Sequence, residues 1–154
     1  FLPQLIQKAG VAQAAFEVIK TTLIQRDAAP VSRGEVVLAT VKGDIHDIGK
    51  NIVRVLLENY GYTVLDLGKD VPCQLVADTA KEHNVKLVGL SALMTTTLGA
   101  MEETIQLVKA ACPDCKVVVG GAVLTADYAE KIGADFYAKD AAASTRVASA
   151  FFDD

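Results

Sequence analysis

The chain has 154 residues, of which 51% are hydrophobic, so it is long enough for one domain with a buried core and too short for two large ones. Its formal net charge of −4 argues against the clustered positive charge with which nucleic-acid-binding domains contact phosphate. The sequence has neither an apolar run of about 18 residues that would cross a membrane nor a basic and then apolar signal segment. We therefore expect a soluble, cytoplasmic protein without nucleic-acid or membrane partners.

The first 26 residues have the spacing of one long amphipathic helix. Apolar residues recur at steps of three and four from Leu2 to Leu23. A lone helix cannot bury such a face, so this one needs partner helices or must pack against another part of the protein. We interpret residues 1–26 as the last helix of a truncated helical cap, and residues 27–34, which contain Pro30 and Gly34, as a linker.

From residue 35 onward, strand patterns alternate with helix patterns. The expected strands are 35–41, 62–68, 85–91, 116–121 and 134–138, and the expected helices lie near 50–60, 72–83, 98–111, 125–132 and 140–152. Five strands that alternate with five helices predict a parallel sheet covered on both faces. Right-handed crossovers favour a flavodoxin-like (Rossmann-like) doubly wound α/β domain over residues 35–154.

In this fold class, ligands bind beyond the carboxyl ends of the strands. The loops that follow four of the expected strands would share that edge of the sheet. They contain the segments "KGDIHDIG" (42–49), "SALMTTT" (91–97), "GGA" (120–122) and "YA" (137–138). A histidine with acids, several hydroxyl groups and bare glycine backbone are therefore expected to converge at one edge.

The first of these loops contains His46, one of two histidines in the chain. Asp44 lies two residues earlier, so in an extended loop the two side chains would point the same way. The carboxylate would then orient the imidazole and raise the basicity of its other nitrogen, as for a metal-ligating histidine. Two other interpretations stay open from the spacing alone. One is a general base, although no nucleophile elbow is present, and the other is a polar loop residue before a helix that Asp47 caps.

The three cysteines lack the spacing of a disulfide framework, which indicates a reducing compartment. Cys112 and Cys115 form a Cys-x-x-Cys pair, but a structural zinc site needs about four ligands, and only Cys73 and the two histidines remain to complete one. Cys112 also continues the apolar helical stripe of residues 98–108, which favours a place in the core over metal or redox chemistry.

The edge residues carry a family resemblance. The chain has the motif Asp44-x-His46-x-x-Gly49, then Ser91-x-Leu93 near the end of the third expected strand, and Gly120-Gly121 at the end of the fourth. This pattern resembles the cobalamin-binding domain of methionine synthase and of the corrinoid proteins that serve methyltransferases. The phrase "ATVKGDIHDIGKNIV" (39–53) is very specific, and residues 1–15 resemble the final helix of the four-helix cap that precedes that domain. The resemblance covers nearly the whole chain.

The resemblance implies that cobalamin binds with its own base displaced from cobalt. His46 would supply the lower axial nitrogen, Asp44 would hold the other ring nitrogen, and Thr97 stands where methionine synthase continues this relay with a serine. The displaced nucleotide tail would pass between the sheet and its helices. The cofactor-binding residues implied are Asp44, Ile45, His46, Asp47, Ile48, Gly49, Ser91, Leu93, Thr95, Thr97, Gly120, Gly121, Ala122 and Tyr137, with Phe1 and Val11 of the cap over the upper face of the corrin.

The function that the resemblance implies is that of a corrinoid methyl carrier, a subunit that is not catalytic by itself. It would shuttle a methyl group from a donor such as a phenyl methyl ether, methanol or a methylamine to an acceptor such as tetrahydrofolate. The expected partners are a donor-specific methyltransferase, a tetrahydrofolate-dependent methyltransferase and a reductive activator.

Three alternative functions share this kind of domain. The first is the cobalamin module of methionine synthase, which the chain's end soon after the last expected helix disfavours if that terminus is native. The second is an adenosylcobalamin mutase, which would present a barrel rather than a cap helix to the cofactor. The third is a cobalamin sensor, for which the sequence offers no DNA-binding segment.

Overall fold

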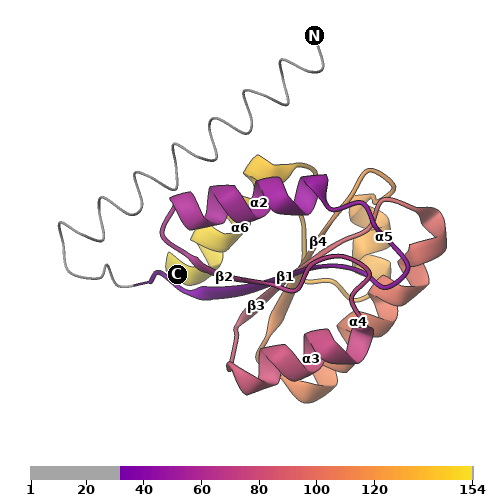
Figure 1. Cartoon of the computed structure of the whole chain (residues 1–154), viewed down its shortest axis with the longest axis horizontal. Helices are drawn as coiled ribbons and strands as arrows, with labels where there is room; N and C mark the ends of the chain where they lie inside the picture. Colours follow the sequence, from indigo (N-terminus) through magenta and orange to yellow (C-terminus); the bar gives the residue numbers. More distant parts are fainter. Residues whose placement is uncertain (1–31, 154) are drawn as a thin grey trace, which may run out of the picture. The chain divides into compact units, whose positions relative to one another are not determined.

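The computed structural model describes residues 32–153, which form the coloured α/β domain of Figure 1. The strands are β1 (Glu35–Thr40), β2 (Thr63–Asp66), β3 (Leu87–Ser91), β4 (Lys116–Gly120) and β5 (Phe136–Tyr137). The helices are α2 (Ile48–Asn59), α3 (Cys73–Glu82), α4 (Leu98–Ala111), α5 (Ala126–Lys131) and α6 (Ala141–Asp153), with a short 3₁₀ helix η1 (Thr95–Thr97) before α4. Every expected strand and helix of this domain is present within a few residues of its expected bounds, and η1 is an addition.

The strands form one parallel sheet in the order β2-β1-β3-β4-β5. This is the strand order of flavodoxin-like doubly wound domains, so the predicted fold class is confirmed. The central strands are buried along nearly their whole length, because helices cover both faces of the sheet. The winding direction reverses between β1 and β3, and the loops that follow these two strands therefore meet at the switch point.

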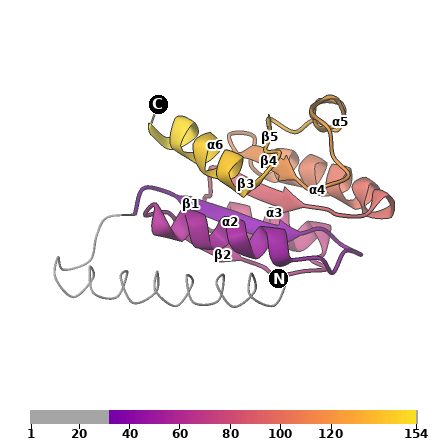
Figure 2. The ribbon, with the colours of Figure 1, turned by 90° about the horizontal axis from the view of Figure 1, so that it is seen from above.

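Two apolar cores flank the sheet. On one face, α3, α4 and α5 pack over side chains such as Val37 and Val88. On the other face, α2 and α6 lie side by side over Val36 and Leu87, as Figures 1 and 2 show. Neighbouring residues of one strand thus enter different cores, because strand side chains alternate between the two faces.

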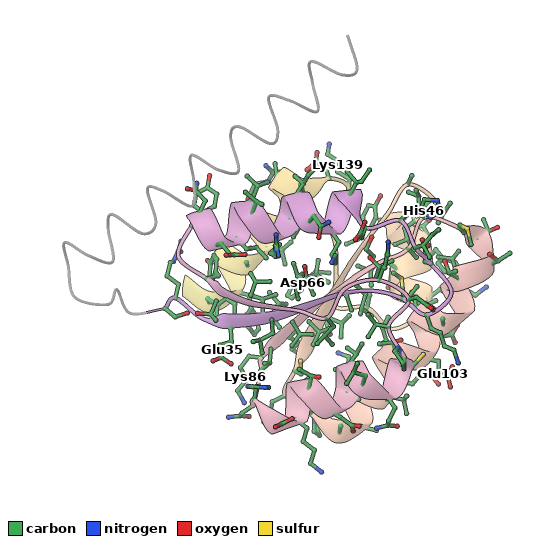
Figure 3. All side chains as sticks on the ribbon, viewed as in Figure 1. Glu35, His46, Asp66, Lys86, Glu103 and Lys139 are labelled. Atoms are coloured by element: carbon green, nitrogen blue, oxygen red, sulfur yellow. The ribbon has the colours of Figure 1, made fainter. Side chains whose placement is uncertain are left out.

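The candidate site lies at the carboxyl edge of this sheet. Figure 3 shows His46 at the end of the sheet opposite to Glu35, which opens β1, and Lys86, which precedes β3. Ser91 is the Cα partner of Thr40, and Val41 N donates a hydrogen bond to Ser91 O at 3.0 Å. The loops that follow β1 and β3 therefore leave the sheet side by side.

The domain begins inside the expected linker. Arg33 and the following residues cluster as one compact unit that extends to the end of the chain. Arg33 N donates to Gly61 O (3.0 Å), its guanidinium lies 4.7 Å from the centre of the Tyr62 ring, and Thr63 N donates to Gly34 O (2.8 Å). The expected helix 1–26 and the earlier part of the linker lie outside the described residues. Within residues 32–153, no helix has the length and hydropathy needed to cross a membrane.

Candidate functional site

The loop that contains His46 connects β1 to α2. It turns sharply after Val41: Asp44 N donates to Val41 O (3.0 Å), and Gly43 has a φ of +87°, a left-handed conformation that glycine tolerates. Asp47 lies directly before α2, but its side chain makes no capping hydrogen bond, so the interpretation of Asp47 as a helix cap is wrong. Its half-buried side chain instead lines the cavity described below.

The fully buried carboxylate of Asp44 accepts hydrogen bonds from two loops. Oδ1 accepts from the backbone N (3.0 Å) and the ring Nδ1 (2.7 Å) of His46, and Oδ2 accepts from Leu93 N (2.7 Å), Met94 N (3.2 Å) and Thr97 Oγ1 (2.9 Å). Burial by itself raises the pKa of Asp44, but these hydrogen bonds, led by that from Leu93, outweigh it and hold the pKa well below its usual range. Asp44 is therefore ionised at neutral pH.

His46 presents one ring nitrogen to Asp44 and leaves the other open. Its side chain is 44% exposed, whereas that of Asp44 is 0% exposed. An ionised carboxylate only accepts hydrogen bonds, so Nδ1 is assigned a proton, and in the neutral ring Nε2 then has the lone pair. A neutral imidazole whose second nitrogen is held by a carboxylate has the arrangement of a metal ligand with its outer support.

Large aliphatic side chains surround His46 on the surface. Ile45 is 63% exposed, Ile48 77% and Leu93 40%. Gly49 adds to this open surface, because a Cβ at that position would have no atom within 4 Å, so no contact within the described domain demands a glycine there. An exposed apolar patch of this kind marks a surface that a ligand or a partner covers.

A cavity of about 560 Å³ opens beside His46 and extends between the sheet and helices α2 and α6. This volume lies within the range of about 300–1,000 Å³ that is usual for ligand pockets. Ten of the residues that the sequence implied line it: Ile45, His46, Asp47, Ile48, Gly49, Ser91, Leu93, Gly120, Gly121 and Ala122. Its far end, near the amino ends of the strands, is lined by Val36, Leu57 and Leu87, all three of them hydrocarbon side chains.

The two glycines after β4 line the cavity for different reasons. Gly121 has a φ of +144°, and a Cβ there would lie 1.8 Å from Ala92 O, so the close approach of the loop after β3 demands a glycine. A Cβ at Gly120 would lie 3.2 Å from Ala138 O, which is tight but less severe. The packing of neighbouring loops is therefore one physical reason for glycine at these two positions, apart from any room that they leave for a ligand.

Besides the buried Asp44, three implied residues of the described domain do not line the cavity. Thr97 is buried beneath it and donates to Asp44, and Thr95 is exposed on η1. Tyr137 packs against the core on the opposite face of the sheet, where its hydroxyl donates to Leu124 O at 3.2 Å. Tyr137 therefore does not line this cavity, although it is among the implied cofactor-binding residues. Phe1 and Val11 lie outside the described residues.

Lys50 is a cavity residue that the sequence reasoning missed. Lys42 is exposed, but Lys50 is 4% exposed and its Nζ lies 2.6 Å from Oδ1 of Asp66. Figure 3 shows Asp66 between α2 and the sheet. Lys50, Val53 and Leu57 follow helical spacing on the face of α2 that lines the cavity, and this spacing is the signal that could have found it.

The three cysteines of this domain are buried or half-buried. All three are free, Cys73 and Cys115 are buried, and Cys112 packs half-buried against the core. Burial, with a smaller Coulombic contribution from Cys112, raises the pKa of Cys115 to about 12, which keeps it a thiol at neutral pH. Within residues 32–153, no group of three or more His, Cys, Asp or Glu side chains could hold a metal ion, so a metal bound by His46 there would need its other ligands from a cofactor.

The fold and the edge site together define a cofactor-binding module of the doubly wound class. The B12 binding domain family model matches residues 34–148, and the chain belongs to this family. It is 43% identical over 143 residues to dimethylamine corrinoid protein 1 of Methanosarcina acetivorans, covering 92% of this chain and 67% of that protein. It is also 43% identical over 143 residues to trimethylamine corrinoid protein 1 of the same organism, covering 66% of that protein. The chain thus spans about two thirds of the length of these relatives.

Solved structures show the same similarity. A novel cobalamin-binding protein from Desulfitobacterium hafniense matches with a TM-score of 0.79 and 36% identity, over 93% of this chain and 70% of that one. The methanol:cobalamin methyltransferase complex MtaBC from Methanosarcina barkeri matches with a TM-score of 0.83 and 33% identity, over 99% of this chain and 58% of that one. Cobalamin is therefore the cofactor of this domain.

The residues of the site fit this cofactor. The open Nε2 of His46 would hold the cobalt, and the exposed side chains of Ile45, Ile48 and Leu93 suit the apolar plane of a corrin. The adjoining cavity suits an elongated group that hangs from that plane. Gly49 has no side chain that would stand between the corrin and the loop, and the space beside it is open.

Proposed function

We propose that this protein is a corrinoid methyl carrier that binds cobalamin with the cofactor's base displaced and His46 as the lower axial ligand. The observation that carries the proposal is the Asp44–His46 pair, which leaves Nε2 exposed at the mouth of the cavity. When bound, the cofactor supplies a cobalt centre that accepts and releases a methyl group. The protein supplies the position of the cofactor and the ligand on its lower face.

The residues divide this work by their positions. His46 would hold the metal through Nε2, and Asp44 accepts the Nδ1 proton and so fixes the direction of the ring. Thr97 donates to the other oxygen of Asp44, and so takes the place of the serine expected from methionine synthase. The nucleotide tail occupies the cavity between the sheet and helices α2 and α6, where the far end is apolar.

The methyl donor is one that a separate methyltransferase recognises. The relatives named above are a dimethylamine corrinoid protein and a trimethylamine corrinoid protein, and one structural neighbour is a methanol:cobalamin methyltransferase complex. These names favour a methylamine or methanol as donor, with a phenyl methyl ether as a third candidate. A tetrahydrofolate-dependent methyltransferase then takes the methyl group, and a reductive activator reduces any cofactor that has become oxidised.

The experiment that tests this function is methyl transfer on the reconstituted protein. Methylcobalamin-loaded protein is mixed with tetrahydrofolate and a corrinoid-dependent methyltransferase, and loss of the methyl-cobalt spectrum is followed. We expect transfer with the wild-type protein and much slower transfer with His46→Ala. Activity that requires adenosylcobalamin instead would contradict a methyl carrier and favour the mutase alternative.

A further inference from the structure

The loop that contains His46 is held by a second segment, residues 66–71, which leads from β2 to α3 and which we call the β2–α3 strap. On the side of the loop that precedes His46, the strap makes two contacts. Asp70 N donates to the backbone O of Asp44 (2.9 Å), and Gly43 N donates to Asp70 Oδ1 (2.8 Å). The strap therefore fixes the main chain of the residue whose carboxylate orients the histidine.

On the side of the loop that follows His46, the strap holds the first turn of α2. Lys50 Nζ lies 2.6 Å from Oδ1 of Asp66, and the two side chains are only 3% and 14% exposed. The same oxygen accepts a hydrogen bond from Gly68 N (2.9 Å), and Arg54 lies 3.7 Å from the other oxygen. A buried, hydrogen-bonded ion pair tolerates the loss of one partner poorly, so it fixes the start of the helix.

The strap is itself anchored to the sheet. Thr40 N donates to Gly68 O (2.9 Å), Val71 N donates to Thr40 O (3.1 Å), and Val71 forms an isolated bridge with Val41. Asp70 has a φ of +51°, in the left-handed region that few residues other than glycine, asparagine and aspartate adopt readily. This conformation is the one in which the Asp70 backbone N and carboxylate both bind the histidine loop.

We propose that the β2–α3 strap is a positioning element that sets the direction in which His46 Nε2 faces the cofactor. Within the loop and the first turn of α2, the partners of Asp66 and Asp70 are Lys50, Gly43 and Asp44 rather than His46, so both act through the loop. The inference rests on the proposed role of His46 as the lower ligand. Loss of an outer partner of a metal ligand typically weakens binding about 10- to 100-fold. The strap is one contact further away, so we expect at least about a threefold effect.

Asp70 offers a matched pair of variants. Asp70→Asn keeps an oxygen acceptor for Gly43 N and tolerates the left-handed backbone, whereas Asp70→Gly tolerates the backbone and loses the acceptor. Asp70 is exposed, so both variants should fold. Lys50→Met tests the other end of the strap. Lys109→Met is its control, because Lys109 pairs with Asp135 at the amino edge of the sheet.

The readout is the electron paramagnetic resonance spectrum of protein reconstituted with cob(II)alamin, in which an axial nitrogen splits the cobalt lines. We expect the ratio of uncoordinated to coordinated cofactor to rise at least about threefold in Asp70→Gly and Lys50→Met. The ratio should stay at the wild-type value in Asp70→Asn and Lys109→Met. Circular dichroism confirms that each variant is folded, and if Lys50→Met is not, the Asp70 pair decides alone.

Two outcomes would overturn the inference in distinguishable ways. If folded Asp70→Gly has the wild-type ratio of uncoordinated to coordinated cofactor, the strap is not a positioning element, and His46 can still be the ligand. If His46→Ala gives the same spectrum as the wild type, His46 is not the ligand and the strap has no ligand to position.

Discussion

His46 Nδ1 lies 2.7 Å from Oδ1 of Asp44, and this contact joins a surface imidazole to a carboxylate without any exposed area. The buried charge keeps its ionised form because five hydrogen bonds from two loops converge on it. The contact therefore couples the direction of the ring to the packing at the switch point of the sheet. A histidine held in this way presents Nε2 in one orientation.

Replacement of Asp44 by asparagine tests how strongly this centre stabilises the domain. The amide has one accepting oxygen where the carboxylate has two, so at least one buried donor loses its partner. We expect the free energy of unfolding to fall by about 1–3 kcal/mol in urea titrations of the cofactor-free protein. Asp47→Asn is the control, because the Asp47 side chain makes no capping hydrogen bond. Equal stability of the two variants would contradict this account of Asp44.

Thr97 separates the effect of a hydroxyl from that of a methyl group. Thr97→Val removes the donor to Asp44, a hydrogen bond to a charged group that should stabilise by about 1.5–3 kcal/mol. Thr97→Ser keeps the donor and loses a methyl that packs beside Gly43, which should cost about 0.8 kcal/mol. Urea unfolding should therefore rank serine above valine in stability. The reverse order would show that packing of the methyl outweighs the hydrogen bond.

Val53→Phe tests the place of the nucleotide tail. Val53 lies half-buried on α2 and lines the cavity, so a larger ring there would fill space that the tail needs. We expect cobalamin to bind at least about tenfold more weakly, a loss of about 1.4 kcal/mol, while cobinamide, which lacks the tail, binds as before. Leu75→Phe on the exposed surface of α3 is the control. Equal weakening of both corrins would place the tail elsewhere.

The raised pKa of Cys115 predicts that the domain loses stability at alkaline pH. The thiol has a pKa of about 12 in the folded protein and of about 9 in the unfolded chain, so above about pH 9 the unfolded state binds fewer protons. Stability should then fall as pH rises, by up to about 1.4 kcal/mol per pH unit from this group. Urea unfolding near pH 8 and near pH 10 should show a smaller drop for Cys115→Ala than for the wild type. Equal drops would mean that Cys115 does not titrate in this way.

The elements of the domain and the central pair of the site could be predicted from the sequence because they depend on local patterns. Each strand is an apolar run bounded by turn residues, and Asp44 and His46 lie on one loop. The strand order and the meeting of the loops after β1 and β3 follow from the rules of doubly wound sheets. The hydroxyl of Thr97 could be assigned to the relay only through the family resemblance.

The remaining features depend on tertiary contacts that residue type does not reveal. Lys50 is buried because Asp66, sixteen positions away, neutralises it. Gly121 is demanded by the backbone of Ala92. The face on which Tyr137 packs could not be predicted, because β5 contains only two residues, both aromatic, so no alternation marks its faces. Phe1 and Val11 stay predictions.

The most direct measurement of the central claim uses protein in which both histidines carry ¹⁵N, reconstituted with cob(II)alamin. Axial ¹⁴N splits each cobalt line into three and ¹⁵N into two, so coordination by His46 predicts that the three-line pattern becomes a two-line pattern on labelling. His83→Ala should leave this change intact, and His46→Ala should abolish the nitrogen splitting. A three-line pattern that persists in the labelled protein would show that the cofactor's own base stays on cobalt, and would contradict the account.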